Sequence, residues 1–205
     1  MIDVGLEPKT NPKSASQVFP QRRTFTVHEF HAMIEAGVLS KGDRAELFDG
    51  EVIDMAPIGV GHAAATRKLA NLFPRNADVI VDVQNPLRLS EEVEVYPDVF
   101  LPKPEESFYS DRIPTANDVL LTIEISDSTL PFDRGPKLAR YAEAGVPEVW
   151  IVDLKGERVL THRRPLDGVY GEVNEFKRGA SVKLEALGEA EFAVDDILPQ
   201  VQIED

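Results

Sequence analysis

The chain contains no cysteine among its 205 residues. This absence excludes disulfides, thiolate zinc sites and cysteine nucleophiles, and it is typical of a protein from a reducing compartment. No apolar run approaches the roughly 20 residues that a membrane-spanning helix needs. The N-terminus also lacks the basic start and apolar stretch of a signal peptide. We therefore expect a cytoplasmic protein with no membrane partner.

Basic residues are scarce relative to acidic ones. The chain has 22 Lys and Arg against 36 Asp and Glu, a formal net charge of −14. Affinity for polyanions comes mainly from many Lys and Arg contacts, so a non-specific nucleic-acid coat protein is disfavoured. Hydrophobic residues make up 42% of the chain, enough for a sizeable core. An enzyme with a small local basic patch is compatible with this composition.

The N-terminal third of the chain predicts a polar arm, two helices and a hairpin. Residues 1–22 are polar and show no periodicity, so we expect a flexible arm before a single domain over residues 23–205. Thr26 and Glu29 have capping-box spacing ahead of an apolar helical face. The motif DG at positions 49 and 50 lies between alternating apolar residues, a strong hairpin signal. A second helix is expected over residues 62–73, ended by the following proline.

From residue 78 the pattern changes to strands. We expect the segments VIVDVQ, PLRLS and VEVYPDVFLP to be neighbouring strands, followed by an exposed loop over residues 102–118. VLLTIEIS, a helix that opens at Asp133 and ends at Gly145, and EVWIVDL form a strand–helix–strand unit, which predicts two parallel strands. RVLTHRR and VYGEVNEF predict an antiparallel pair. The expected fold class is α/β (α+β), with a mixed central sheet, flanking helices and additional β-hairpins.

Several residues that resemble functional motifs are better explained without one. His28 and His31 belong to HEFH, which is not the HExxH of zinc proteases, so surface histidines on an amphipathic helix are favoured. Gly59 and Gly61 precede a helix but match neither a dinucleotide fingerprint nor a phosphate loop. Ser126 is not in a GxSxG elbow, so a serine hydrolase has no support.

Glu124 is a stronger candidate because it lies inside the apolar run VLLTIEIS. A carboxylate in such a run costs several kcal/mol unless it is paired, protonated or bound to a metal. Strand periodicity places Glu124 on the same face as Thr122 and Ser126. The alternative is an edge strand with one solvated face, which would need no site at all.

The distribution of charge points to a metal and a phosphate. Residues 91–133 hold eleven acidic residues and two basic ones, whereas residues 134–164 hold seven basic and four acidic ones. Clustered carboxylates select hard divalent cations, and Mg²⁺ typically takes one or two of them together with waters and a phosphate. A neighbouring lysine can then hold a water or a phosphate oxygen.

Six motifs in order resemble the Uma-two family, within the PD-(D/E)xK nuclease superfamily. They are ELFDGE near Glu46, a histidine opening the next helix at His62, VQNPLRL around Gln84, YPDV, a strand ending in IEIS, and DRGPK followed by Y-x-x-x-GVPEVWIVD. The resemblance covers about residues 24–195. It implies a restriction endonuclease-like core and Mg²⁺-dependent hydrolysis of DNA phosphodiester bonds, with Mn²⁺ as a substitute metal.

The resemblance also assigns site residues. Asp98 matches the aspartate of PD and Glu124 the second acid; both would bind the metal, with the backbone carbonyl of Ile125 as a third oxygen. The usual lysine two residues after the second acid is replaced by Ser126. In the Uma-two pattern the lysine comes from the following helix, which makes it Lys137, in the expected first helical turn. The competing interpretation of Lys137 is a surface pair with Asp133.

Three more residues match family positions. Glu46 would lie near the metal, and Gln84 would orient a water or a phosphate from an adjacent strand. His62 matches the family's helix-opening histidine, and packing over the site is as compatible with its position as a functional role.

Two other functions stay open at this point. One is a catalytically idle nuclease fold that serves as a binding or regulatory module, and the other is a structural oligomer with a charged groove. The acidic charge and the missing lysine at position 126 favour an idle fold, whereas the joint presence of Asp98, Glu124 and Lys137 favours a nuclease. We also expect a homodimer, because nucleases of this superfamily often pair two sites to cut both strands.

Overall fold

The computed structural model describes residues 22–40, 44–76, 79–188 and 190–200. Its largest sheet has five strands in the order β5-β6-β7-β8-β9. These are β5 (Val99–Pro102), β6 (Val119–Ser126), β7 (Glu148–Asp153), β8 (Arg158–Leu166) and β9 (Val169–Lys177). β6 and β7 pair in parallel and the other neighbours are antiparallel. The sheet is therefore mixed, and both the parallel unit and the β8–β9 pair confirm the sequence-based expectation.

Two smaller sheets flank the large one. The first has the order β2-β1-β4-β3, with β1 (Ala45–Phe48), β2 (Glu51–Asp54), β3 (Leu87–Arg88) and β4 (Glu94–Val95). The second pairs β10 (Ser181–Lys183) with β11 (Glu191–Ala193). In the β1–β2 turn both Asp49 and Gly50 have positive φ, 52° and 74°. This conformation suits a tight hairpin and explains the DG sequence.

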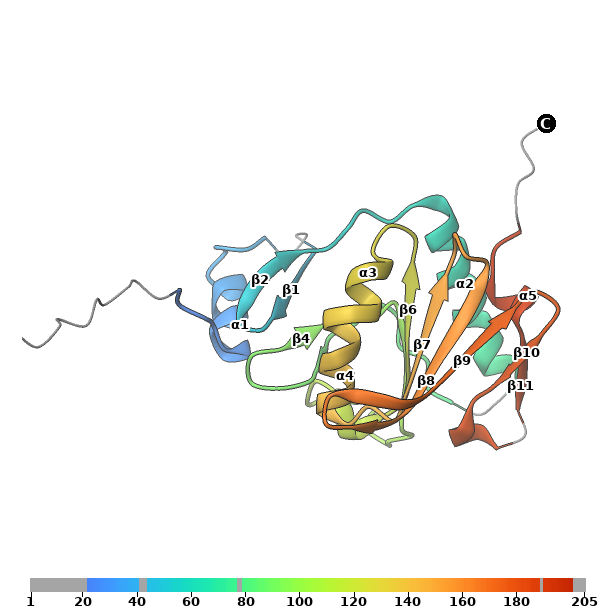
Figure 1. Cartoon of the computed structure of the whole chain (residues 1–205). Helices are drawn as coiled ribbons and strands as arrows, with labels where there is room; N and C mark the ends of the chain where they lie inside the picture. The colour runs from blue at the N-terminus through green and yellow to red at the C-terminus, as the bar shows by residue number, and fades with distance from the viewer. Residues whose placement is uncertain (1–21, 41–43, 77–78, 189, 201–205) are drawn as a thin grey trace, which may run out of the picture.

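Helices cover the two faces of the large sheet (Figure 1). On one face, Leu69 and Phe73 of α2 (Val60–Asn76) pack with Ile123, Trp150 and Phe192, near the short helix α5 (Val194–Ile197). On the other face, a continuous helical segment runs through α3 (Leu130–Phe132), the π-helical turn η2 (Asp133–Lys137) and α4 (Leu138–Ala144). Tyr141 of α4 packs there on the side chains of β7 and β8.

Helix α1 (Val27–Glu35) lies against the sheet that contains β1 and β2. Its capping box is present: the Glu29 amide donates to Thr26 Oγ1 (3.2 Å), and Glu29 Oε2 accepts from the Thr26 amide (3.0 Å). His28 is exposed, whereas His31 Nε2 lies 2.7 Å from Oε1 of the fully buried Glu94. His31 thus anchors α1 to β4.

Several expectations about the strands and helices are wrong in detail. Residues 79–84 form no regular strand, and only Asp82 bridges to Phe100. The expected strand over residues 93–102 is split between two sheets by Tyr96-Pro97-Asp98, because proline has no amide hydrogen for a ladder. Pro74 lies inside α2, which ends two residues later. The helix expected to open at Asp133 begins at Leu130.

β6 is an inner strand and not an edge strand. It lies between β5 and β7, and Thr122, Glu124 and Ser126 are at most 4% exposed. The solvated-face interpretation of Glu124 is therefore wrong, and its carboxylate is buried between the sheet and the α3–α4 segment. In the described residues, no helix is long and apolar enough to span a membrane. The expected arm lies outside the described residues except for Arg22, so its flexibility remains a prediction, as does the single domain.

Two elements complete the connections: η1 (Ala116–Asp118) precedes β6, and η3 (Glu185–Leu187) lies between β10 and β11. With these helices and sheets the chain has the expected mixed α+β architecture. The carboxyl ends of β6 and β7 lie at the same end of the large sheet, because the two strands are parallel.

Candidate functional site

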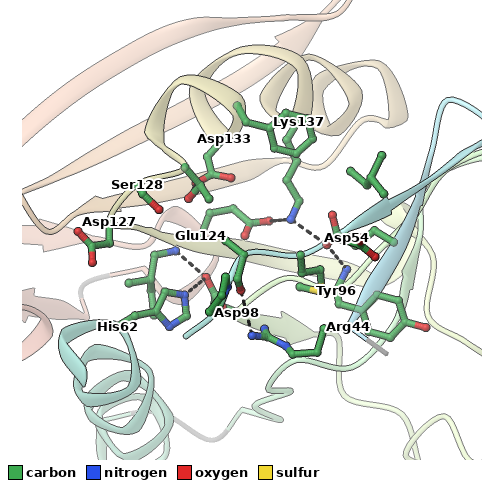
Figure 2. Close-up of a pocket in the computed structure, with 18 of the residues that line it drawn as sticks. Arg44, Asp54, His62, Tyr96, Asp98, Glu124, Asp127, Ser128, Asp133 and Lys137 are labelled. Atoms are coloured by element: carbon green, nitrogen blue, oxygen red, sulfur yellow. Dashed lines mark hydrogen bonds and ion pairs between the residues drawn. The ribbon is translucent and has the colours of Figure 1, made fainter. Parts of the chain in front are cut away.

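A cavity of about 370 Å³ opens where β6 ends. Its walls come from the β1–β2 hairpin, the segment after β2 and the first turn of α2. The residues just before β5, the end of β6 and the chain that follows β6 through α3 and η2 complete them. Figure 2 shows the side chains of Asp98, Glu124, Lys137 and His62 directed into this space from separate elements. Elements that are distant in sequence therefore meet at one cavity that several charged side chains line.

Asp98 directly precedes β5, and three donors fix its carboxylate. The Ile125 amide donates to Asp98 Oδ2 (2.9 Å), and His62 Nε2 lies 3.0 Å from the same oxygen. The side-chain amide of Gln84 donates to Asp98 Oδ1 (3.2 Å). Asp98 is only 6% exposed. Its side chain is consequently oriented by β6, α2 and the segment before β3 at once.

Gln84 reaches Asp98 from a strained backbone and not from a strand. Its φ of 53° lies in the left-handed region, and its amide donates to the Pro97 carbonyl (3.1 Å). Such conformations cost roughly 1–3 kcal/mol and persist where the surroundings impose them. The strain is thus coupled to the placement of a hydrogen-bond donor on Asp98.

Glu124 has a hydrogen-bond partner and an ion-pair partner on the same oxygen. The Tyr141 hydroxyl donates to Glu124 Oε1 in a short hydrogen bond, and Lys137 Nζ lies 3.0 Å from the same atom. Lys137 and Tyr141 are four residues apart on one helical face, so a single helix presents both groups to β6. Tyr141 is fully buried, and burial raises the pKa of its phenol well above the ordinary value. It therefore remains a proton donor at neutral pH.

Lys137 lies at the end of the π-helical turn and is 4% exposed. Its Nζ donates to Glu46 Oε1 (3.0 Å), and Glu46 Oε1 also accepts from the Tyr96 amide (2.8 Å). Burial alone would lower the pKa of Lys137, but the Glu124 and Glu46 carboxylates raise it above the ordinary value. The ammonium is thus held between two buried acids. The surface pair with Asp133 is wrong, and so is the position in a first helical turn.

Asp133 fastens the helical segment to β6. Ser126 Oγ and Thr129 Oγ1 each donate to Asp133 Oδ2 at 2.6 Å. Burial raises the pKa of Asp133, and the two hydroxyl hydrogen bonds oppose that rise. Ser126, which stands where the sequence resemblance led us to look for a lysine, therefore holds the helix that supplies Lys137.

The site carries more negative than positive charge. The acidic residues that line the cavity are Glu46, Asp54, Asp98, Glu124, Asp127 and Asp133, against the cationic Arg44 and Lys137. Burial raises the pKa of Glu124 to about 8; the Lys137 ammonium opposes this rise, and the Asp133, Asp98 and Glu46 carboxylates add to it. Burial, together with the surrounding carboxylates, outweighs the effect of the Lys137 ammonium, so Glu124 tends to hold a proton.

The cavity brings together most of the residues expected from the sequence. Glu46, Asp98, Glu124, Ile125 and Lys137 all line it, and His62 does so as well. Gln84 lies behind Asp98 and lines a neighbouring cavity instead. Sequence reasoning missed Tyr141 and the role of Asp133. Tyr141 is four residues after Lys137, and Asp133 is four residues after Thr129. This helical spacing was the sequence signal that could have placed each pair on one face.

Comparison with known proteins identifies the family. Residues 27–195 match the Uma2 family model, whose description is "Putative restriction endonuclease". The chain belongs to the Uma2 family. No curated protein shows significant similarity to it. Among solved structures, the chain is similar to a protein from Anabaena variabilis described as "a putative nuclease belonging to DUF820".

The Anabaena structure shares the fold of this Uma2 member. The TM-score is 0.63 at 16% identity, and the match covers 84% of this chain and 97% of the other. Because the identity is low, the likeness concerns the fold and not the chemistry of the site. It supports the restriction endonuclease-like architecture expected from the motifs.

Proposed function

We propose that this Uma2 protein is a Mg²⁺-dependent endonuclease that hydrolyses DNA phosphodiester bonds. The observation that carries the proposal is the convergence of Asp98, Glu124 and Lys137 on one cavity in a member of a family described as restriction endonucleases. These residues come from the position just before β5, from near the carboxyl end of β6 and from the helical segment after β6. Folding alone has no evident need to gather them in a cavity.

The donor set suits Mg²⁺. The described residues contain no group of three or more side chains of the His, Cys, Asp or Glu type placed to hold a metal. Mg²⁺ does not require such a cage, since it usually binds one or two carboxylates and keeps waters or substrate phosphates as its other ligands. Asp98 and Glu124 provide the two carboxylates, and the Ile125 carbonyl is the proposed third protein oxygen. Mn²⁺ should substitute, because it accepts the same oxygen ligands.

The residues around the metal ligands have separate tasks. Bound Mg²⁺ would supply a more acidic water and neutralise charge that builds on the scissile phosphate. Lys137 has three N–H donors; Glu46 and Glu124 fix its position, and a remaining donor would stabilise the phosphate oxygens in the transition state. His62 and Gln84 would keep the Asp98 carboxylate oriented.

The charge of the cavity supports an order of binding. Six acidic side chains line it against Arg44 and Lys137, so even with Glu124 protonated a phosphate diester would be repelled from the metal-free site. A divalent cation must therefore bind before or together with DNA. A divalent cation bound at the site, rather than the protein's own charge of −14, would then account for the local acceptance of a polyanion.

Cleavage of supercoiled plasmid tests the proposal. We expect nicking with Mg²⁺ or Mn²⁺, none with EDTA, and loss of cleavage in Asp98→Asn. Asp111→Asn is the matched control, because Asp111 is exposed and lies outside the cavity. Circular dichroism should show that both variants fold. If the wild type binds Mg²⁺ but cuts neither duplex nor single-stranded DNA, the idle-module alternative replaces the nuclease.

A homodimer remains part of the proposal. Among the described residues, β9 is an edge strand of the large sheet, and it carries the exposed side chains of Val169 and Val173. Such an edge can pair with another copy. Sedimentation equilibrium at micromolar concentration should give twice the chain mass of 22.7 kDa, and a monomer would contradict this part.

A further inference from the structure

A second cavity of about 340 Å³ adjoins the candidate site. Arg44, Met55 and Tyr96 line both cavities, so these side chains form the boundary between them. Gln84 lines the second cavity and also donates its amide to Asp98 Oδ1 (3.2 Å). Only the Gln84 side chain would therefore separate a group in the second cavity from the Asp98 carboxylate, which we propose binds the metal.

The lining of the second cavity is mostly apolar with a few polar groups. Phe30 and Ile34 of α1 and Leu39 after it contribute apolar surface, and Tyr96 contributes an aromatic ring. Arg44 and Gln84 provide N–H donors. The Tyr96 side chain joins an aromatic ring to a hydroxyl that can donate and accept, which suits stacking and hydrogen bonding rather than charge pairing.

The α1 wall of the second cavity is fixed in place. The Val27 amide donates to the Glu91 carbonyl (2.8 Å), and His31 pairs with the buried Glu94. Phe30 is 1% exposed and packs with Val27 and Leu47. On the other side, Arg44 donates to the Ala56 carbonyl (3.2 Å), which links it to the segment that borders both cavities. The cavity is hence held by packing and hydrogen bonds on both sides.

We propose that the second cavity binds the base of an unpaired nucleotide adjacent to the scissile phosphate. This inference rests on the proposed function and names its substrate class: DNA that is single-stranded, or locally unpaired, at the cut. A base attached next to a phosphate at Asp98 can reach a cavity that shares three side chains with the site. A cavity near the lower end of the usual range for ligand pockets suits one planar group rather than a larger ligand.

Charge also favours a base as the occupant. The site cavity is rich in carboxylates and the chain carries −14, so backbone phosphates contribute little affinity through Lys and Arg. Stacking and base-edge hydrogen bonds do not depend on net charge, and stacking on aromatic side chains tolerates every base. Within a duplex the base is paired and stacked, so it must be unpaired or extruded to enter.

The experiment compares two small probes that differ only in the base. We would measure binding of 2′-deoxyadenosine 5′-monophosphate and of 2-deoxyribose 5-phosphate by calorimetry with Ca²⁺, which fills the metal site without supporting cleavage. The base should improve affinity by about tenfold or more, as one aromatic stacking contact does. Equal affinity of the two probes overturns the proposal. Tighter binding of phenyl phosphate than of the nucleotide also overturns it, in favour of a small apolar group.

Cavity-filling variants locate the effect. In Ile34→Trp and Leu39→Trp the new ring would occupy the second cavity, so the two probes should bind with equal affinity. Val38→Trp is the matched control because Val38 is 69% exposed and lines neither cavity; it should keep the difference. A difference that persists in both filled variants contradicts the assignment. The wild-type comparison stands even if a filled variant does not fold.

Cleavage separates this inference from the proposed function. Single-stranded oligonucleotides with a tetrahydrofuran abasic analogue beside the cut should be cleaved more slowly than normal ones. Preference for the base in binding, without any metal-dependent cleavage, would refute the nuclease and leave a nucleotide-binding site. Metal-dependent cleavage without any base preference would refute the second-cavity assignment and leave the nuclease.

Discussion

Replacing Lys137 with methionine should destabilise the protein in a pH-dependent manner. The change removes an ammonium that lies 3.0 Å from both Glu46 Oε1 and Glu124 Oε1, and methionine retains most of the aliphatic stem. All three residues are at most 4% exposed. Removing one partner of a buried ion pair costs about 3–5 kcal/mol, because the other charge stays buried without compensation. We expect a loss of that size in the free energy of unfolding at pH 9.

The sign of the pH dependence follows from Glu124. Its pKa in the folded protein is about 8 against an ordinary value of 4.5, so the folded state binds the proton more tightly than the unfolded state. The stabilisation from this proton is complete below about pH 4.5 and is lost as the pH rises through about 8. At pH 5.5 Glu124 is largely neutral and does not need Lys137. Only Glu46 then loses its partner, and the destabilisation by Lys137→Met should be smaller.

Urea unfolding in EDTA at pH 5.5 and pH 9 measures both effects. A chain of this size should also lose roughly 2–4 °C in melting temperature for each kcal/mol. The double variant Lys137→Met, Glu124→Gln removes both charges of one pair, so it should recover part of the stability at pH 9 and none of the cleavage. A loss below about 1 kcal/mol at pH 9, the level of an exposed pair, would refute the reasoning. An equal loss at both pH values would do the same.

Three further predictions address metal binding and the backbone. Tyr141→Phe keeps the ring but removes the hydroxyl that holds Glu124, so the Mn²⁺ affinity measured by electron paramagnetic resonance should fall about 10- to 100-fold; unchanged affinity contradicts this role. The Mg²⁺ affinity of the wild type should rise as the pH passes through about 8, because metal binding requires ionised Glu124. A Mg²⁺ affinity that stays constant from pH 6 to 9 in calorimetry would contradict this prediction. Gly50→Ala should lower the free energy of unfolding by more than about 1 kcal/mol, since a Cβ at Gly50 would lie 2.4 Å from Thr24 Cβ. Gly37→Ala is the control: Gly37 has the same φ of 74° with nothing within 4 Å, so this variant should lose less stability in urea unfolding.

Features that depend on neighbouring residues could be predicted from the sequence. The capping box at Thr26, the hairpin at Asp49 and Gly50, and the parallel pairing of β6 and β7 each follow from local chemistry or from periodicity. The motif order also placed Glu46, Asp98, Glu124 and Lys137 in one site. The structure reproduces most of the features that these local sequence patterns predict.

Contacts between distant segments could not be predicted in the same way. Lys137 and Glu46 are 91 residues apart, and His31 and Glu94 are 63 apart. No periodicity encodes such pairs, because they depend on how two sheets and a helix pack. The strand break at Pro97 shows a further limit: the apolar pattern of residues 93–102 continues through it, but the missing amide hydrogen and the change of sheet do not appear in that pattern.

The hydrogen bond of Ser126 explains why the ammonium beside Glu124 comes from the helical segment and not from β6. Ser126 faces the same side of β6 as Glu124, is fully buried and donates to Asp133 Oδ2. A lysine at position 126 would therefore lie beside Asp133 and break the hydrogen bond that fastens the helical segment to the strand. With Ser126 used for that attachment, an ammonium for Glu124 has to come from the opposite wall of the cavity. Lys137 supplies it from the helix that Ser126 holds in place, so the serine and the displaced lysine depend on each other.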